Sequence, residues 1–197
     1  MGLDIPGASL DLATDAGTFS PSRIDPGTRV LLDALAPGVD LPPGDLVDVG
    51  AGYGPIALTL AQWHPDRTVW AVEVNERARQ LCRENAHAAG LADRVRVAAP
   101  EEVPADRQVA AVFSNPPIRI GKAALHDLLT AWFARVDPEG EAWLVVQRHL
   151  GADSLARWIA AGGRRVTRVQ SKRGYRVLRV TAGASDRPGA AGGPEDA

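Results

Sequence analysis

Short apolar runs alternate along the chain with longer segments in which apolar residues recur every three or four positions. The short runs are rich in valine, leucine and alanine, which is typical of strands buried on both faces of a sheet. They predict strands at 46–50, 68–73, 94–98, 109–114 and 142–147. The longer segments predict helices near 26–36, 56–61, 75–89, 122–135 and 152–161. Strands that alternate with helices at this spacing form a parallel sheet covered on both faces.

Local signals mark the ends of several elements. Asp25 followed by Pro26 is typical of an N-cap and a first helical turn, and Gly90 is typical of a helix C-terminus. Segments 164–170 and 175–181 flank Ser171-Lys172-Arg173-Gly174 and predict a terminal hairpin. The hairpin raises the expected number of strands to seven and puts one antiparallel strand into an otherwise parallel α/β sheet.

The composition fits one globular unit. The chain has 197 residues and a mass of 20.8 kDa, with 45% hydrophobic and 23% charged residues. This length allows a substantial core, whereas two compact domains would be cramped. We expect one domain over residues 1–181, in which 1–24 form an N-terminal cover segment. Residues 182–197 consist mainly of glycine, alanine, proline and acids and predict a disordered tail.

The sequence also bears on the compartment. It contains no run of eighteen apolar residues, and its start lacks the cationic and apolar regions of a signal peptide. The single cysteine, Cys82, allows no internal disulfide and suggests a reducing compartment. The four histidines show no metal-ligand spacing with one another or with Cys82. We therefore expect a cytoplasmic protein with no metal and no membrane partner.

A glycine-rich segment, Asp48-Val49-Gly50-Ala51-Gly52-Tyr53-Gly54, joins the first of these strands to the next helix. Glycines let the backbone turn sharply and pass close to a ligand, and the helix start supplies free N–H donors. The spacing is G-x-G-x-G, which differs from the NAD-binding pattern and from a P-loop. Glu73 ends the next strand, where a carboxylate can accept both hydroxyls of a ribose. A simpler interpretation is that Asp48 caps the loop and Glu73 caps the next helix.

A second segment with chemical content is Ser114-Asn115-Pro116-Pro117-Ile118, which ends the strand at 109–114. The two prolines remove backbone donors and fix φ, so the chain has to leave the sheet there. The side-chain carbonyl of Asn115 and the main-chain carbonyl of Pro116 then offer two acceptors. Such a pair suits an amino group that is held while its nitrogen reacts. Taken alone, the segment is also explained as a strand followed by a proline turn.

Taken together, these segments resemble the class I S-adenosylmethionine-dependent methyltransferases, and more narrowly the methyltransferase small family. That family includes the guanine-N2 methyltransferases of small-subunit ribosomal RNA. The resemblance covers about residues 15–180 and rests on segments in the family's order at 18–20, 25–28, 48–55, 114–122, 145–147 and 172–178. It implies a Rossmann-like fold in the compact form that lacks the additional N-terminal domain of longer members.

The resemblance also implies roles for single residues. S-adenosylmethionine would be bound by Asp48, Gly50, Ala51, Gly52, Gly54, Glu73, Val74, Glu101 and Asn115. Glu101 is included only as a substitute for an aspartate that relatives place after the third strand. The catalytic segment would be Asn115, Pro116, Pro117 and Ile118, with Asn115 and Pro116 accepting hydrogen bonds from the target amine. Many relatives have an aromatic residue in place of Ile118, which could stack on a planar target, and we interpret Ile118 as a subgroup mark.

Substrate contacts are expected at the same sheet edge. Residues 164–179 contain seven Lys or Arg and no acid, and a basic rim beside an active site can contact phosphates. The expected substrate-binding residues are Phe19, Arg119, Lys122, Lys172 and Arg173. An alternative is that the charges keep an edge hairpin from pairing with other strands. Phe19 has two interpretations as well, since it could cover the cofactor or the flipped base, or pack on the first helix.

The expected function is S-adenosylmethionine-dependent N-methylation of an exocyclic amine of an RNA base, in particular guanine N2 of ribosomal RNA. The base would leave its stack to reach the site. The expected partner is ribosomal RNA or the small ribosomal subunit. Two alternatives stay open. One is methylation of a protein glutamine amide, which Ile118 disfavours because such enzymes usually have an aromatic residue there. The other is a module that binds cofactor and RNA without catalysis.

Overall fold

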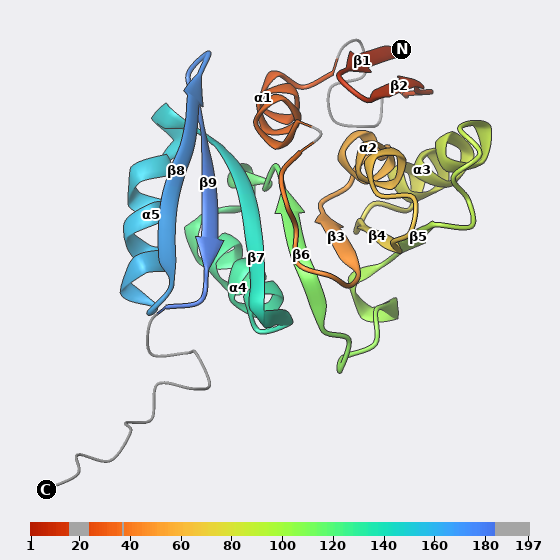
Figure 1. The fold of residues 1–197 in the computed structure, drawn as a ribbon. Helices are drawn as coiled ribbons and strands as arrows, with labels where there is room; N and C mark the ends of the chain where they lie inside the picture. Colours follow the sequence, from red (N-terminus) through yellow and green to blue (C-terminus); the bar gives the residue numbers. More distant parts are fainter. Residues whose placement is uncertain (16–23, 37, 184–197) are drawn as a thin grey trace, which may run out of the picture.

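The fold is taken from a computed structural model that describes residues 1–15, 24–36 and 38–183, with the side chain of Arg119 outside the description. Its centre is a seven-stranded sheet in the order β5-β4-β3-β6-β7-β9-β8 (Figure 1). The strands are β3 (Leu46–Val49), β4 (Val69–Val72), β5 (Val95–Ala98), β6 (Val109–Ser114), β7 (Val136–Gln147), β8 (Arg165–Lys172) and β9 (Tyr175–Thr181). Five neighbouring strands of the sheet, β5, β4, β3, β6 and β7, pair in parallel, and β9 is antiparallel to both β7 and β8. The predicted mostly parallel sheet with one antiparallel strand is confirmed.

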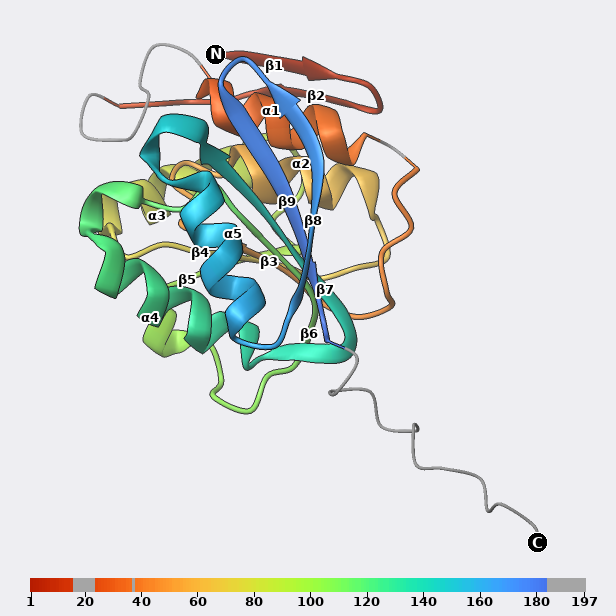
Figure 2. The same ribbon diagram turned by 90° about the vertical axis from the view of Figure 1, so that its left-hand side faces the viewer.

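Helices cover both faces of the sheet (Figures 1 and 2). They are α1 (Pro26–Leu35), α2 (Pro55–Trp63), α3 (Glu76–Ala88), α4 (Lys122–Phe133) and α5 (Ala152–Ala161). Short 3-10 turns follow three strands: η1 (Pro100–Glu102), η2 (Ile118–Ile120) and η3 (Arg148–Leu150). One buried cluster joins α1, α2 and α3 to the sheet, and a second joins α4 and α5 to the other face. Among the described helices none is both long and apolar enough to cross a membrane.

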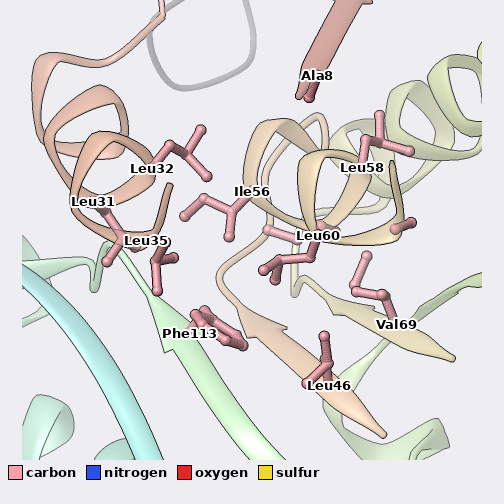
Figure 3. Packing of buried hydrophobic residues seen from close by; sticks show 14 of the residues in the cluster. Ala8, Leu31, Leu32, Leu35, Leu46, Ile56, Leu58, Leu60, Val69 and Phe113 are labelled. Atoms are coloured by element: carbon pink, nitrogen blue, oxygen red, sulfur yellow. The ribbon is translucent and has the colours of Figure 1, made fainter. Parts of the chain in front are cut away.

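The packing of α1 decides where its N-terminus lies. Leu32 and Leu35 are buried, and they point toward Ile56 of α2 and Phe113 of β6 (Figure 3). Each such side chain contributes roughly 1.5–3 kcal/mol through removal of apolar surface from water. This packing places the start of α1 beside the end of β6, so residues near positions 25 and 115 meet at one edge of the sheet.

The described part of the predicted cover segment is a hairpin, which the sequence pattern did not predict. It consists of β1 (Gly2–Ile5) and β2 (Ala8–Asp11), with Gly7 in the turn at φ 75°. Its buried side chains alternate with exposed ones and pack against α2. Each strand has only four residues, which is too short a stretch of alternation to stand out in the sequence. Residues 16–23, and Phe19 with them, lie outside the described residues.

Strand β7 also begins earlier than expected, at Val136 instead of 142. Pro138 and Gly140 are residue types that are rare inside strands, and they interrupt the apolar run before position 142. In the structure the pairing with β6 continues through a register shift, and a Cβ on Gly140 would lie 2.7 Å from the Ala110 carbonyl oxygen. Glycine at position 140 therefore permits the backbones of β6 and β7 to approach each other closely within the strand pair.

Candidate active site

A cleft of about 530 Å³ lies at the carboxyl edge of the sheet, where β3, β4, β6 and β7 end. Among its walls are the loops after these strands, the start of α1 and part of α4. The predicted site residues that line it are Gly50, Ala51, Gly52, Glu73, Val74, Asn115, Pro116, Pro117 and Ile118. Two segments more than sixty residues apart in the sequence therefore share one cavity: a Cβ on Gly50 would lie 3.9 Å from Pro117 Cδ.

The glycine loop needs the left-handed backbone conformation that glycine adopts freely. Gly52 has a φ of 58° and Gly54 a φ of 97°. A Cβ on Gly54 would lie 2.7 Å from the sulfur of buried Cys82, so a side chain there would collide with α3. A Cβ on Gly52 would meet no atom within 4 Å. Because Gly52 lines the cleft, a ligand can approach its backbone closely.

Glu73 connects the glycine loop to the start of α3. Its Oε2 accepts a hydrogen bond from Gly52 N–H at 2.9 Å, and its Oε1 accepts one from Asn75 N–H at 2.9 Å. Each carboxylate oxygen keeps a further lone-pair site. The carboxylate is thus fixed at the cleft wall and can still accept hydroxyl donors. It also holds the N-cap residue of α3, so the capping interpretation applies at the same time.

Asp48 does not line the cleft. Its side chain is fully buried, and Oδ2 accepts a hydrogen bond from Ala57 N–H at 3.1 Å. Gly54, the N-cap of α2, has no side chain to do this, so Asp48 caps that helix from β3. Burial is the main reason that the pKa of Asp48 is raised to about 8; the negative charge of Glu73 adds to the rise, and the Ala57 bond opposes it.

Asn115 follows β6 with its amide turned toward α1. Its Nδ2 donates to Asp25 Oδ1 at 2.7 Å and to Thr28 Oγ1 at 3.1 Å. Ser114, the residue before it, donates from its hydroxyl to the Val49 carbonyl at 2.7 Å and ties the ends of β6 and β3 together. The Pro116 carbonyl, predicted as a second acceptor, already accepts from Ile118 N–H at 2.8 Å. A carbonyl oxygen has two lone pairs, so one remains for a ligand.

Several cleft residues were not recognised as site residues from the sequence. They are Asp25 and Thr28 at the start of α1, Tyr53 in the glycine loop, Trp132 in α4, and Gln147 and Tyr175 at the junction of β7 and β9. The family-like segments at 25–28, 145–147 and 172–178 contain four of these residues. That resemblance was the signal available, but it did not say which side chains face the cavity.

Other predicted residues lie away from the cleft. Glu101 is exposed in η1, while its neighbour Pro100 lines the cavity. Lys122 is exposed at the first position of α4, and Arg173 is exposed in the hairpin turn. Lys172 Nζ donates to Asp33 Oδ2 at 3.0 Å. The side chain of Arg119 is outside the described part of the chain, as is Phe19.

The basic hairpin uses several of its charges within the protein. Arg168 and Arg176 both pair with Asp153 of α5, and Arg179 pairs with buried Glu141. Together with the bond from Lys172 to α1, these pairs hold β8 and β9 against both helical layers. The basic composition of 164–179 therefore serves to a large extent to anchor the edge of the sheet.

The fold is that of class I methyltransferases. Over 92% of this chain and 50% of the other, it superposes with a TM-score of 0.78 and 22% identity on a T. thermophilus 16S rRNA N2 methyltransferase solved with AdoMet and guanosine. A methyltransferase from Pyrococcus furiosus gives a TM-score of 0.68 at 20% identity, covering 87% of each chain. At these identities the likeness concerns the fold.

Sequence comparison gives the family. The family described as Methyltransferase small domain matches residues 9–179. The chain is 36% identical over 171 residues to the uncharacterized protein YbxB of Bacillus subtilis (strain 168), covering 85% of this chain and 83% of the relative. It is 30% identical over 160 residues to ribosomal RNA small subunit methyltransferase C of Shewanella amazonensis, covering 79% of this chain but 46% of that protein. The chain belongs to the Methyltransferase small domain family and is an S-adenosylmethionine-dependent methyltransferase.

The residues present fit this cofactor. The cleft volume lies in the range of small-molecule sites. The space over Gly52 lets a ligand approach the backbone, and Glu73 offers acceptors for hydroxyl groups. Among the described residues, no group of three or more His, Cys, Asp or Glu side chains could hold a metal ion.

Proposed function

We propose that the protein methylates an exocyclic amine of a base in ribosomal RNA, in particular guanine N2. The observation that carries the proposal is the arrangement of Asn115 at the cleft wall. Its amide donates to Asp25 and Thr28 at the start of α1, which leaves its carbonyl oxygen as an acceptor beside the glycine loop. An acceptor here suits a substrate that brings N–H donors.

The proposed chemistry needs little beyond positioning. The cofactor supplies a methyl group on a sulfonium. The amine of a base is a poor nucleophile because its lone pair is drawn into the ring. Asn115 Oδ1 and the Pro116 carbonyl would each accept one of its hydrogens and so localise the lone pair toward the methyl group. The nitrogen–carbon bond forms as the sulfur–carbon bond breaks, and the methylated nitrogen then loses a proton to water.

The apolar lining supports a flat, uncharged target. Ile118, Leu128 and Trp132 line the cavity, and Val74, Ile120 and Leu150 at the cleft are among the few exposed large apolar side chains of the described residues. These apolar side chains can pack against a flipped base. In this proposal Ile118 would pack against the base without π-stacking.

The RNA assignment is supported by relatives that are named ribosomal RNA methyltransferases. The chain spans less than half the length of these relatives. Arg148 is exposed and directly follows the cleft residue Gln147, and Lys122 and Arg173 are exposed farther from the cleft, so these cations are available for phosphates. We therefore propose ribosomal RNA or the small subunit as the partner and the cytoplasm as the location. We further propose that residues 1–181 act as one methyltransferase domain.

The proposal is tested by offering three acceptors in parallel with a radiolabelled methyl donor. These are isolated small ribosomal subunits, the free ribosomal RNA, and a release-factor-like protein that carries a glutamine acceptor. Label in RNA supports the proposal, and the comparison of subunits with free RNA identifies the preferred form. Label on the protein alone would establish the glutamine alternative. No transfer to any acceptor by a protein that binds the cofactor would favour the non-catalytic alternative.

A further inference from the structure

The side-chain amide of Asn115 is bound to helix α1 through both of its hydrogens. The two bonds, to Asp25 Oδ1 and Thr28 Oγ1, connect positions 90 and 87 residues apart in the sequence. An amide nitrogen has two hydrogens, so these bonds use its whole donor capacity. Thr28 is 4% exposed, which makes its hydroxyl a fixed partner within the protein.

This arrangement allows one orientation of the amide. Turning it by 180° would bring Asn115 Oδ1 against Asp25 Oδ1, and two acceptors at hydrogen-bond distance repel each other. Asp25 Oδ1 is fixed as well, because it caps α1 by accepting from Gly27 N–H at 2.8 Å and from Thr28 N–H at 3.0 Å. The carbonyl oxygen of Asn115 is therefore directed away from α1.

We propose that Asp25 and Thr28 are positioning residues for methyl transfer. They form a clamp that holds Asn115 as an acceptor, so that it receives an N–H of the target and disfavours a substrate that presents a carbonyl oxygen there. The inference rests on the proposed function, in which Asn115 binds the amine. It goes further by making the start of α1 part of the amine site.

The clamp also has an electrostatic effect. Hydrogen bonds in a chain polarise one another, so the carboxylate of Asp25 makes the Asn115 carbonyl a stronger acceptor. During methyl transfer the amine nitrogen becomes positive. A stronger acceptor then stabilises the transition state more than the ground state. The clamp is therefore expected to act on turnover and to leave cofactor binding nearly unchanged.

Two variants separate the clamp from the helix cap. Serine is as good an N-cap as aspartate, but its uncharged hydroxyl stands one bond closer to the backbone, so Asp25→Ser keeps the cap and weakens the bond from Asn115. Asp25→Ala removes both, and the difference between these variants measures the cap. We expect Asp25→Ser to lower kcat on RNA by about tenfold to a hundredfold. Its affinity for S-adenosylmethionine, measured by calorimetry, should change by less than about twofold.

Thr28 offers a matched pair of variants. Thr28→Val preserves the shape of the side chain and removes the hydroxyl acceptor, whereas Thr28→Ser keeps the hydroxyl. We expect Thr28→Val to lower kcat by about threefold to tenfold, and Thr28→Ser to recover most of this loss. An equal loss in both variants would mean that packing, not the hydroxyl, is responsible, and would remove Thr28 from the clamp.

A double-mutant cycle tests whether Asp25 acts through Asn115. In the Asn115→Ala background there is no amide to hold, so Asp25→Ser should cause no further loss of kcat. An equal loss in both backgrounds would show that Asp25 acts independently of Asn115 and would overturn the proposal.

A last measurement does not depend on the substrate. The chain has three asparagines, Asn75, Asn85 and Asn115, so asparagine-selective ¹⁵N labelling gives few side-chain amide signals. In the wild type the Asn115 hydrogens should exchange slowly with water, and in Asp25→Ser at least about tenfold faster, with Asn75 and Asn85 unchanged. Unchanged exchange at Asn115 would refute the clamp. If RNA is not methylated at all, the proposed function fails, whereas this experiment still decides on the clamp.

Discussion

Replacing Asp48 by asparagine is expected to remove a large pH dependence of stability. Burial raises the pKa of Asp48 to about 8, from a usual value of 3.8. Between these values the folded protein holds a proton that the unfolded chain has lost. The free energy of unfolding therefore falls as the pH rises through this window, by about 1.4 kcal/mol per pH unit. From pH 5 to pH 7 the loss due to Asp48 is about 3 kcal/mol.

Urea unfolding followed by far-UV circular dichroism at pH 5, 6 and 7 measures this effect. In Asp48→Asn the contribution is absent, because the amide does not titrate and can still accept from Ala57 N–H. Asp33→Asn is a suitable control. The carboxylate of Asp33 is partly buried, which opposes ionisation, but its bonds to Lys172 and Arg29 outweigh this and lower its pKa, so its contribution changes only below the window. Equal pH slopes in the wild type and Asp48→Asn would show that Asp48 does not keep a proton in the folded protein over this pH range.

Three further substitutions test the cleft. Asn115→Ala should lower kcat by at least about 100-fold and leave S-adenosylmethionine affinity within about twofold by calorimetry; a collapse of affinity would assign Asn115 to the cofactor. Glu73→Gln should weaken cofactor binding by about tenfold, whereas Glu84→Gln, on the exposed surface of α3, should not; equal effects would contradict the ribose assignment. Gly54→Ala should lower the free energy of unfolding by more than about 1 kcal/mol because of its φ of 97° and the approach to Cys82 Sγ. Adding Cys82→Ala should recover part of that loss, and no recovery would mean that the sulfur is not the obstacle.

The elements that the sequence predicted well have strong local causes. Strand β6 is buried at all six positions, so its apolar run was continuous, and two prolines stop it. The N-terminus of α1 was predicted correctly because Asp25 caps it, and its side chain accepts hydrogen bonds from the N–H groups of Gly27 and Thr28. The end of α3 was predicted correctly because Gly90 follows it in the left-handed conformation.

What the sequence did not reveal depends on contacts between distant positions. Asp25 was assigned only a capping role, because nothing local indicates that β6 ends beside it with Asn115, 90 residues later. Lys172 was expected to contact substrate, yet it bonds to Asp33, 139 residues earlier. The partners of Asn115 and Lys172 depend on the order of the strands in the sheet and on which helix packs against them. A pattern of apolar positions predicts strands and helices but leaves that arrangement open.

We propose that the cleft transfers a methyl group to the exocyclic amine of guanine in ribosomal RNA. The most direct test is to incubate small-subunit RNA, free and in particles, with the enzyme and S-adenosylmethionine, digest it to nucleosides and identify the product by mass spectrometry. We expect N2-methylguanosine with the wild type and its near absence with Asn115→Ala. A methyl group on a ring carbon, on a ribose hydroxyl or only on protein would contradict it.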